Sequence, residues 1–212
     1  MTFDGWPRAA LDFYRGLEVD NSKAYWLAHR EVYEQKVLQP MTELLDELAE
    51  EFGQGRVFRP YRDVRFSADK SLYKTAIGAT LSGGGYVQLS ARGLAAGAGC
   101  HRLAPDQLER YRRAVDTELS GEDLRARIAA VEAHGIEITV RDALKTVPRG
   151  YPKEHPRADL LTHKDLAAWT EWGTEAWLQS AEAKEYLIAF LHDARPLTTW
   201  LDEHVGPTTL TR

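Results

Sequence analysis

The sequence contains little cysteine, no long uncharged apolar run and no excess of basic residues. Its one cysteine, Cys100, excludes an internal disulfide. No uncharged apolar stretch approaches the roughly 20 residues that a membrane-spanning helix needs, so we expect no membrane association. The net charge of -5 disfavours nucleic acid as a partner, because the overall field repels a polyanion.

The N-terminal sequence also lacks the features of a secretory signal. MTFDGWPRAALDF has an acid and a proline where a signal peptide needs a basic start and an apolar run. Together with the single cysteine, this predicts a cytoplasmic protein. The chain has 212 residues, of which 43% are hydrophobic, and this is enough for a buried core. We expect a single domain over residues 1–212.

The hydrophobic pattern changes its period along the chain. Residues 6–17 and 21–52 have apolar positions at helical spacing, with Asp20 or Asn21 as the cap of the second helix and Pro40 expected to kink or split it. Strand-like segments follow at 57–67, 75–81, 86–91 and 94–101. Beyond them we expect helices at 105–119, 123–134, 160–172, 175–178, 181–194 and 197–204, one strand at 136–140 and a loop at 146–156. This order predicts an α+β fold, with a small antiparallel sheet of about four or five strands packed against N-terminal and C-terminal helices.

Residues 62–75, RDVRFSADKSLYKT, combine four basic and two acidic residues with three Ser or Thr hydroxyls and a Tyr. If residues 62–67 form a strand, side chains alternate between its two faces. One face then holds Arg62, Val64 and Phe66, with Val64 and Phe66 anchoring the buried side, and the other face holds Asp63, Arg65 and Ser67. A neighbouring carboxylate keeps a guanidinium in place, and a fixed guanidinium binds a carboxylate or phosphate through two parallel hydrogen bonds.

The charge of this region is opposite to that of the rest of the chain. Between residues 56 and 75 there are six bases and two acids, a net charge of +4, so the remainder carries -5 minus 4, or -9. A positive patch on a negative protein attracts small anions but repels a long polyanion outside the patch. The pattern therefore favours a compact anionic ligand over a nucleic-acid duplex.

The same segment closely resembles the R-D-x-R-F-S-x-D-K-x-x-Y-K-T pattern of the domain-of-unknown-function 2461 family, whose members are uncharacterised and mostly bacterial. DNSKAYWLAHREVYE, YVQLSARGLAAGAGCHRLAPDQLERYRRAV and PRGYPKEHPRADLLTHK resemble other parts of the family in the expected order, so the resemblance covers nearly the whole chain. Leu72, Asp20 and Ala68 depart from the residues that are common there. The resemblance implies one α+β domain with no known cofactor, and it implies no mechanism.

Our first hypothesis is a polar cleft that binds a small phosphorylated or carboxylated molecule. Its candidate anion contacts are Arg62, Arg65, Lys70 and Lys74; Asp63 and Asp69 would orient them, and Ser67 and Tyr73 would supply neutral hydrogen bonds. If the loop PRGYPKEHP folds over this patch, Arg149, His155 and Lys164 would complete the pocket. Whether chemistry follows binding stays open. Metal-free acid–base chemistry on an anionic substrate would be the simplest reaction.

Two other functions stay open from the sequence. In one, the polar segment is a structural ion-pair network in a non-catalytic interaction module, and the aromatic C-terminal helices contact a protein partner of unknown identity. In the other, the basic patch binds nucleic-acid ends. The scattered histidines lack metal-pair spacing, and GGGYVQLSARGLAAGAG lacks a phosphate-loop motif, so we expect no metal and no cofactor.

Overall fold

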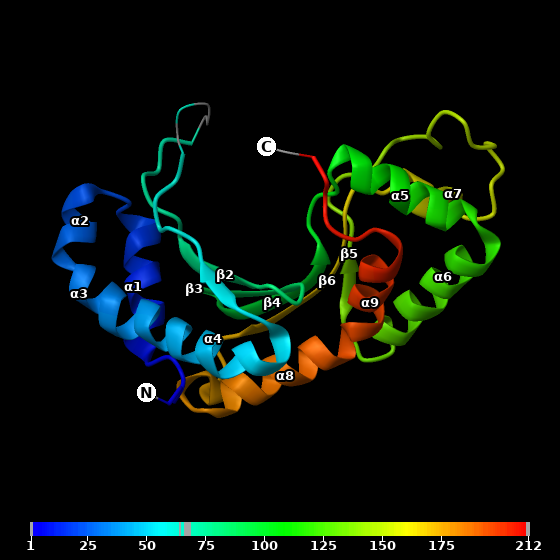
Figure 1. Ribbon diagram of the computed structural model, residues 1–212. Helices are drawn as coiled ribbons and strands as arrows, with labels where there is room; N and C mark the ends of the chain where they lie inside the picture. The colour runs from blue at the N-terminus through cyan, green and yellow to red at the C-terminus, as the bar shows by residue number, and fades with distance from the viewer. Residues whose placement is uncertain (1, 64, 66–68, 211–212) are drawn as a thin grey trace. The chain divides into compact units, whose positions relative to one another are not determined.

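The computed structural model describes residues 2–63, 65 and 69–210. Over these residues the chain forms helices and a six-stranded antiparallel sheet with the strand order β1-β2-β3-β4-β6-β5 (Figure 1). The predicted α+β class is confirmed, but the expected four or five strands are wrong. The chain divides into two compact units, residues 1–96 with 171–189 (unit 1) and residues 97–170 with 190–212 (unit 2). A single domain over residues 1–212 stays a prediction.

Unit 1 begins with a series of helices. Ser22, and not the predicted Asp20 or Asn21, caps α2, because its hydroxyl accepts a hydrogen bond from the backbone N–H of Tyr25 at 3.1 Å. Pro40 lies at the start of α4, directly after a π-helical stretch, so the long helix is interrupted where its missing N–H falls. The helices are α1 (Arg8–Val19), α2 (Lys23–Ala28), α3 (Arg30–Val32), the π-helical η1 (Tyr33–Leu38) and α4 (Gln39–Phe52).

Residues 171–189, the second segment of unit 1, pack against the N-terminal residues. This segment contains η2 (Ala176–Gln179) and the first part of α8 (Glu182–Asp193). Trp6 is fully buried, and its backbone N–H donates to the carbonyl of Leu178 at 2.8 Å. Lys184 of α8 pairs with Glu47 of α4 at 2.7 Å. These contacts join residues that are far apart in the sequence.

The strands follow the pattern that the sequence predicts, except that the first strand ends early, at Val57, and a sixth strand is added. They are β1 (Gly55–Val57), β2 (Ala76–Leu81), β3 (Gly85–Ser90), β4 (Gly93–Cys100), β5 (Glu137–Thr139) and β6 (Leu166–Gly173). In β3, Val87 and Leu89 are fully buried while Tyr86 and Gln88 are half-buried, so one face of the β2–β3 pair is open. Gly93 has φ of 111°, and a Cβ there would lie 1.6 Å from the carbonyl oxygen of Gly173.

The sixth strand, β6, replaces most of the helix expected over residues 160–172. Only α7 (Ala158–Thr162) is helical there. In β6, Leu166 and Ala168 are fully buried, and Ala168 pairs with Ile138 of β5. Residues such as Leu and Ala favour a helix locally, but pairing with a neighbouring strand overrides that weak preference.

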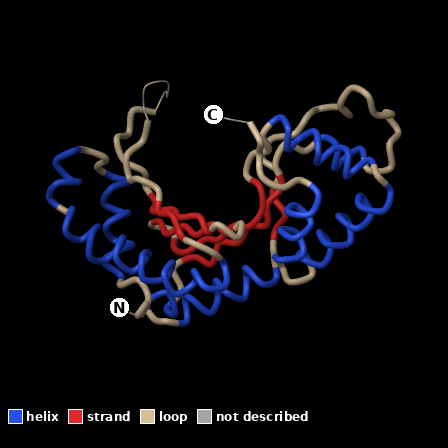
Figure 2. Tube along the Cα trace, in the orientation of Figure 1, coloured by secondary structure: helices blue, strands red, loops and turns tan. Residues whose placement is uncertain are grey.

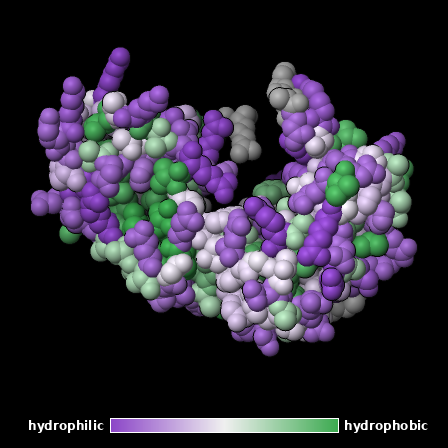
Figure 3. All heavy atoms as spheres, turned by 180° about the vertical axis from the view of Figure 1, so that it is seen from behind, coloured by the Kyte–Doolittle hydropathy of each residue, from purple (hydrophilic) through white to green (hydrophobic). Residues whose placement is uncertain are grey.

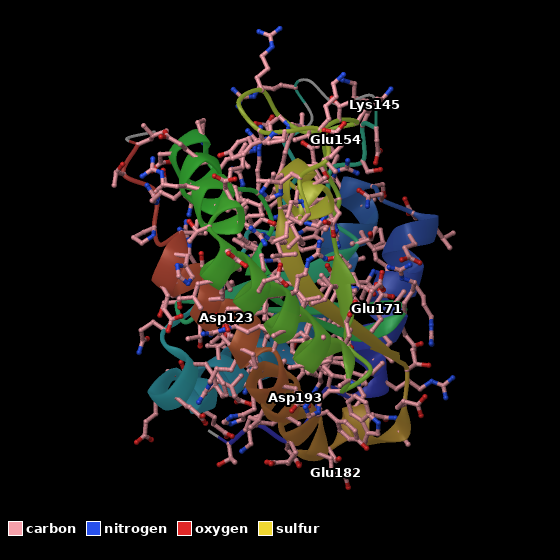
Figure 4. The ribbon with its side chains drawn as sticks, turned by 90° about the vertical axis from the view of Figure 1, so that its right-hand side faces the viewer. Asp123, Lys145, Glu154, Glu171, Glu182 and Asp193 are labelled. Carbon is pink, nitrogen blue, oxygen red and sulfur yellow. The ribbon has the colours of Figure 1, made fainter. Side chains whose placement is uncertain are left out.

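Unit 2 is built around three longer helical segments, whose prediction is confirmed with shifted ends. They are α5 (Pro105–Asp116), α6 (Glu118–Glu132) and α9 (Arg195–His204). The buried Trp200 of α9 donates its indole N–H to the carbonyl of Ser120 at 2.9 Å. Asp123, labelled in Figure 4, projects from α6 and pairs with Arg127 one turn later at 2.8 Å. None of the helices formed by the described residues is long and apolar enough to cross a membrane.

Candidate functional site

The polar segment lies on a long connection between β1 and β2, which we call the arm (residues 58–75; Figure 2). The strand expected to run to residue 67 ends at Val57, and within the described part of the arm only Tyr61 and Tyr73 form an isolated bridge. Val64, Phe66 and Ser67 lie outside the described residues, so their predicted roles stay predictions. Three backbone hydrogen bonds join the two limbs of the arm to each other and to β2: Phe58 N to Gly78 O at 2.9 Å, Arg62 N to Leu72 O at 3.0 Å, and Lys74 N to Pro60 O at 2.8 Å.

The returning limb of the arm is fixed to the N-terminal helices at Tyr73. The side-chain oxygen of Asn21 accepts from the Tyr73 N–H at 2.9 Å, and its amide nitrogen donates to the Tyr73 carbonyl at 3.1 Å. The Tyr73 ring stacks on the buried Trp26, with centroids 4.3 Å apart and planes 5° apart. Tyr73, predicted as a ligand contact, is therefore buried in this attachment.

The outer part of the arm holds two local ion pairs. Arg65 donates to both carboxylate oxygens of Asp63, at 3.0 and 2.6 Å, and this pairing lowers the pKa of Asp63. Asp69 accepts hydrogen bonds from the hydroxyl and the N–H of Ser71, at 2.6 and 2.9 Å, and also from Arg62. Ser71 and then Arg62 hold the pKa of Asp69 well below its usual range.

This outer part is exposed and hydrophilic. Asp63, Arg65, Asp69 and Lys70 are all exposed. On the face that Figure 3 shows, hydrophilic side chains run along the arm. Neither Asp63 nor Arg65 lies in a strand, and Ser67 lies outside the described residues, so the alternation of these three on one strand face stays a prediction. The Ser71 N–H donates to the side chain of Asp69 two residues earlier, as in an Asx-turn.

A pocket of about 340 Å³ lies at the base of the arm, on the open face of β2 and β3. Gly78 is part of its floor, where a Cβ would lie 2.6 Å from the hydroxyl of Tyr86. That hydroxyl donates to the side-chain oxygen of Gln88 at 2.9 Å, which leaves the Gln88 amide nitrogen as a donor. None of the described residues that line the pocket is acidic. They are Phe58, Arg62, Lys74, Thr75, Ala76, Gly78, Tyr86 and Gln88.

Two of the predicted anion contacts, Arg62 and Lys74, line this pocket. The side chain of Arg62 is 31% exposed, and one of its N–H groups is bonded to Asp69, so the carboxylate orients the guanidinium. The ammonium of Lys74 lies 5.3 Å from the centre of the Phe58 ring, within the range of a cation–π contact. Burial, and secondly the nearby charge of Arg59, lowers the pKa of Lys74.

The other predicted site residues, His155 and Lys164, belong to unit 2 and have partners there. His155 is buried; its Nδ1 accepts from the Arg157 N–H at 3.0 Å and its Nε2 lies 3.1 Å from a carboxylate oxygen of Asp116. Lys164 pairs with Asp142 at 3.0 Å. Each thus contributes to the local structure of unit 2.

Sequence reasoning missed several residues that build the pocket and fix the arm. Phe58, Tyr86 and Gln88 line the pocket, and Asn21 and Trp26 hold the arm. The alternation of polar and apolar residues in YVQLS was a usable signal for the open face. No local signal connected Asn21 with Tyr73, which is 52 residues away. Among the described residues, no group of three or more His, Cys, Asp or Glu side chains is arranged to hold a metal ion.

Comparison with known proteins gives a family and a distant structural similarity. The model of the family described as conserved hypothetical protein (DUF2461) matches residues 9–200. No curated protein matches the sequence. Among solved structures, a conserved hypothetical protein from Pyrococcus furiosus is 20% identical, with a TM-score of 0.38, over 78% of this chain and 96% of that one. A TM-score this low carries no inference about the structure or function of the chain.

Proposed function

The chain belongs to the DUF2461 family, and we propose that it binds a small anionic ligand, phosphorylated or carboxylated, in the pocket at the base of the arm. The observation that carries the proposal is the presence of Arg62 and Lys74 in one pocket whose described lining contains no carboxylate. A pocket with two cations and no acid attracts an anion and supplies donors for its oxygens.

The neighbouring groups fit an acceptor-only ligand. Arg62 is oriented by Asp69 through one N–H group, and within the described part of the chain no other acceptor bonds to its guanidinium. Gln88 lines the same pocket, and because its side-chain oxygen accepts from Tyr86, its amide nitrogen remains as a donor. Of the residues predicted from the sequence, this proposal keeps Arg62 and Lys74 as ligand contacts and Asp69 as the residue that orients Arg62.

The test is calorimetry and thermal unfolding with inorganic phosphate and a set of small carboxylates at low salt. We expect a ligand at a hundred times its dissociation constant to stabilise the protein by about 2.7 kcal/mol. Lys74→Gln should weaken binding about tenfold or more, because it removes a charge-assisted contact. The control is Lys36→Gln, which makes the same charge change at an exposed lysine of η1. This variant should bind the ligand like the wild type.

Two results would contradict the proposal. The absence of any stabilisation across the ligand set would remove the pocket as an anion site. A loss of affinity in Lys70→Gln as large as that in Lys74→Gln would place the contact at the exposed outer part of the arm.

A protein-interaction surface is the second candidate, and exposed apolar side chains on the arm favour it. Tyr61 is 51% exposed and Leu72 44% exposed, and the ion pairs of Asp63 and Asp69 are internal to the arm. In that case small anions would not stabilise the protein, whereas Tyr61→Ser with Leu72→Ser would abolish partner binding.

A further inference from the structure

Lys74 differs from the other half-buried lysines in what surrounds its amine. Lys164 pairs with Asp142 at 3.0 Å, and Lys184 pairs with Glu47 at 2.7 Å. Among the described residues, no carboxylate lies within ion-pair distance of Lys74, whose ammonium instead lies over the Phe58 ring. The charge of one cation, Arg59, acts on Lys74, and a second cation, Arg62, lines the same pocket.

These surroundings make the ammonium of Lys74 less stable, relative to the neutral amine, than that of a solvated lysine. Burial and the charge of Arg59 lower the pKa of Lys74, whereas the hydrogen bond to Glu47 raises the pKa of Lys184. A neutral amine has a free lone pair, and lysines that act as nucleophiles are activated by desolvation or by a neighbouring cation. Lys74 has both features and opens into a pocket.

We propose that Lys74 forms an imine with the carbonyl carbon of a small oxo acid, with Arg62 holding the carboxylate of that acid in the same pocket. The inference rests on the proposed anion-binding function. It narrows the ligand class to molecules that carry a carboxylate close to an aldehyde or ketone group. Glyoxylate and pyruvate are the simplest probes with this arrangement.

The step balances without an oxidant or reductant. The Nζ lone pair forms a bond to the carbonyl carbon, and the electrons of the C=O π bond move to oxygen, which takes up a proton and gives a carbinolamine. Loss of the remaining Nζ protons and cleavage of the C–O bond then release one water. One amine and one carbonyl thus give one C=N bond and one water. The protons exchange with solvent, since the pocket is open.

Reductive trapping tests the inference on the intact protein. Glyoxylate or pyruvate is added with sodium borohydride, which reduces an imine to a stable secondary amine, and peptide mass mapping then locates the adduct. We expect Lys74 to be modified at least tenfold faster than the exposed Lys36. Excess inorganic phosphate should slow the reaction at Lys74 and leave Lys36 unaffected. Lys74→Arg keeps a cation but removes the nucleophile, so the fast adduct should disappear.

The outcomes separate this inference from the proposed function. Equal modification of Lys74 and Lys36, in a protein that binds phosphate by calorimetry, overturns the imine and leaves anion binding in place. Failure of phosphate and of both oxo acids to bind the wild type overturns the proposed function itself. The internal comparison of two lysines in one wild-type sample does not depend on the folding of any variant.

Discussion

The arm of unit 1 and the network around Arg157 in unit 2 are both rich in charge, but they use it differently. Arg157 is 4% exposed, and its guanidinium donates to the carbonyls of Val115 and Asp116 and to the carboxylate of Glu122, at 2.6, 2.9 and 2.8 Å. A Cβ on Gly121 would lie 2.4 Å from its Nε, so the chain packs closely around this side chain. In the arm, Lys74 lines a pocket and pairs with no described carboxylate.

The comparison shows that burial alone does not decide what a cation does. The charge of Arg157 is buried, and its cost is offset because protein oxygens surround it. Lys74 is only half-buried and pairs with no carboxylate among the described residues, so it has capacity for an external anion or carbonyl. The availability of acceptors therefore separates a structural cation from a candidate binding residue.

The largest expected effect concerns the Arg157 network. Arg157→Met should lower the free energy of unfolding by about 3 kcal/mol, because buried carbonyls lose their donor. Urea denaturation measures this loss. Arg113→Met is the control on α5, since the Arg113 side chain is 71% exposed and pairs with Glu109 one turn earlier; it should cost less than about 0.5 kcal/mol. A small loss in both variants would break the comparison.

A smaller effect is expected where Asn21 fixes the arm. Asn21→Ala removes two hydrogen bonds to the backbone of Tyr73 and should cost about 2 kcal/mol in urea denaturation. Asn21→Asp keeps the acceptor but sets a carboxylate oxygen against the Tyr73 carbonyl, so it should cost at least as much. If both variants unfold like the wild type, Asn21 does not hold the arm, and the position of Lys74 needs another explanation.

The smallest effect appears only at acid pH and concerns Asp106, a hydrogen-bonded carboxylate of unit 2. Its carboxylate accepts from Thr209 N–H at 2.8 Å and from the Thr208 hydroxyl at 2.7 Å, and these bonds hold its pKa well below the usual range. A depressed native pKa contributes stability above the unfolded value of about 3.9, and this stability is lost as the pH falls toward the native value. Asp106→Asn should flatten the fall of the urea midpoint below about pH 4.

Asp46→Asn, on the exposed side of α4, serves as the control for that pH series and should keep the wild-type slope. An Asp106→Asn protein that loses stability with acid as steeply as the wild type would show that the bonds to Thr208 and Thr209 contribute nothing measurable.

Much of the fold could be predicted from hydrophobic spacing and turn residues. The helices at α1, α5 and α9 and the strands β2 to β4 follow the expected pattern, because their periodicity is local. The strand β6 could not be predicted, since LAAWTEWG has no clear alternation and depends on its pairing with β5. The first strand ends early at Val57, and in the described part of the arm that follows, only Tyr61 and Tyr73 form a bridge.

The site was predicted only in part. Arg62 and Lys74 came from composition, and both line the pocket. The sequence analysis also named Lys70, Lys164 and His155 as ligand contacts. In the structure Lys164 is paired with Asp142, 22 residues earlier, and His155 with Asp116, 39 residues earlier. The roles of these residues as ligand contacts stay predictions, and Ser67 lies outside the described residues.

The sequence by itself determined the class of fold, the family and the concentration of positive charge between residues 56 and 75, because these depend on local order and composition. Only the tertiary structure decided which of those charges lines a pocket, through Gly78, Tyr86 and Gln88 on the open face of the sheet. The physical reason is that a partner for a charged side chain is set by distance in space. Asn21 reaches Tyr73 and Glu47 reaches Lys184 across separations of 52 and 137 residues, and no local pattern records such contacts.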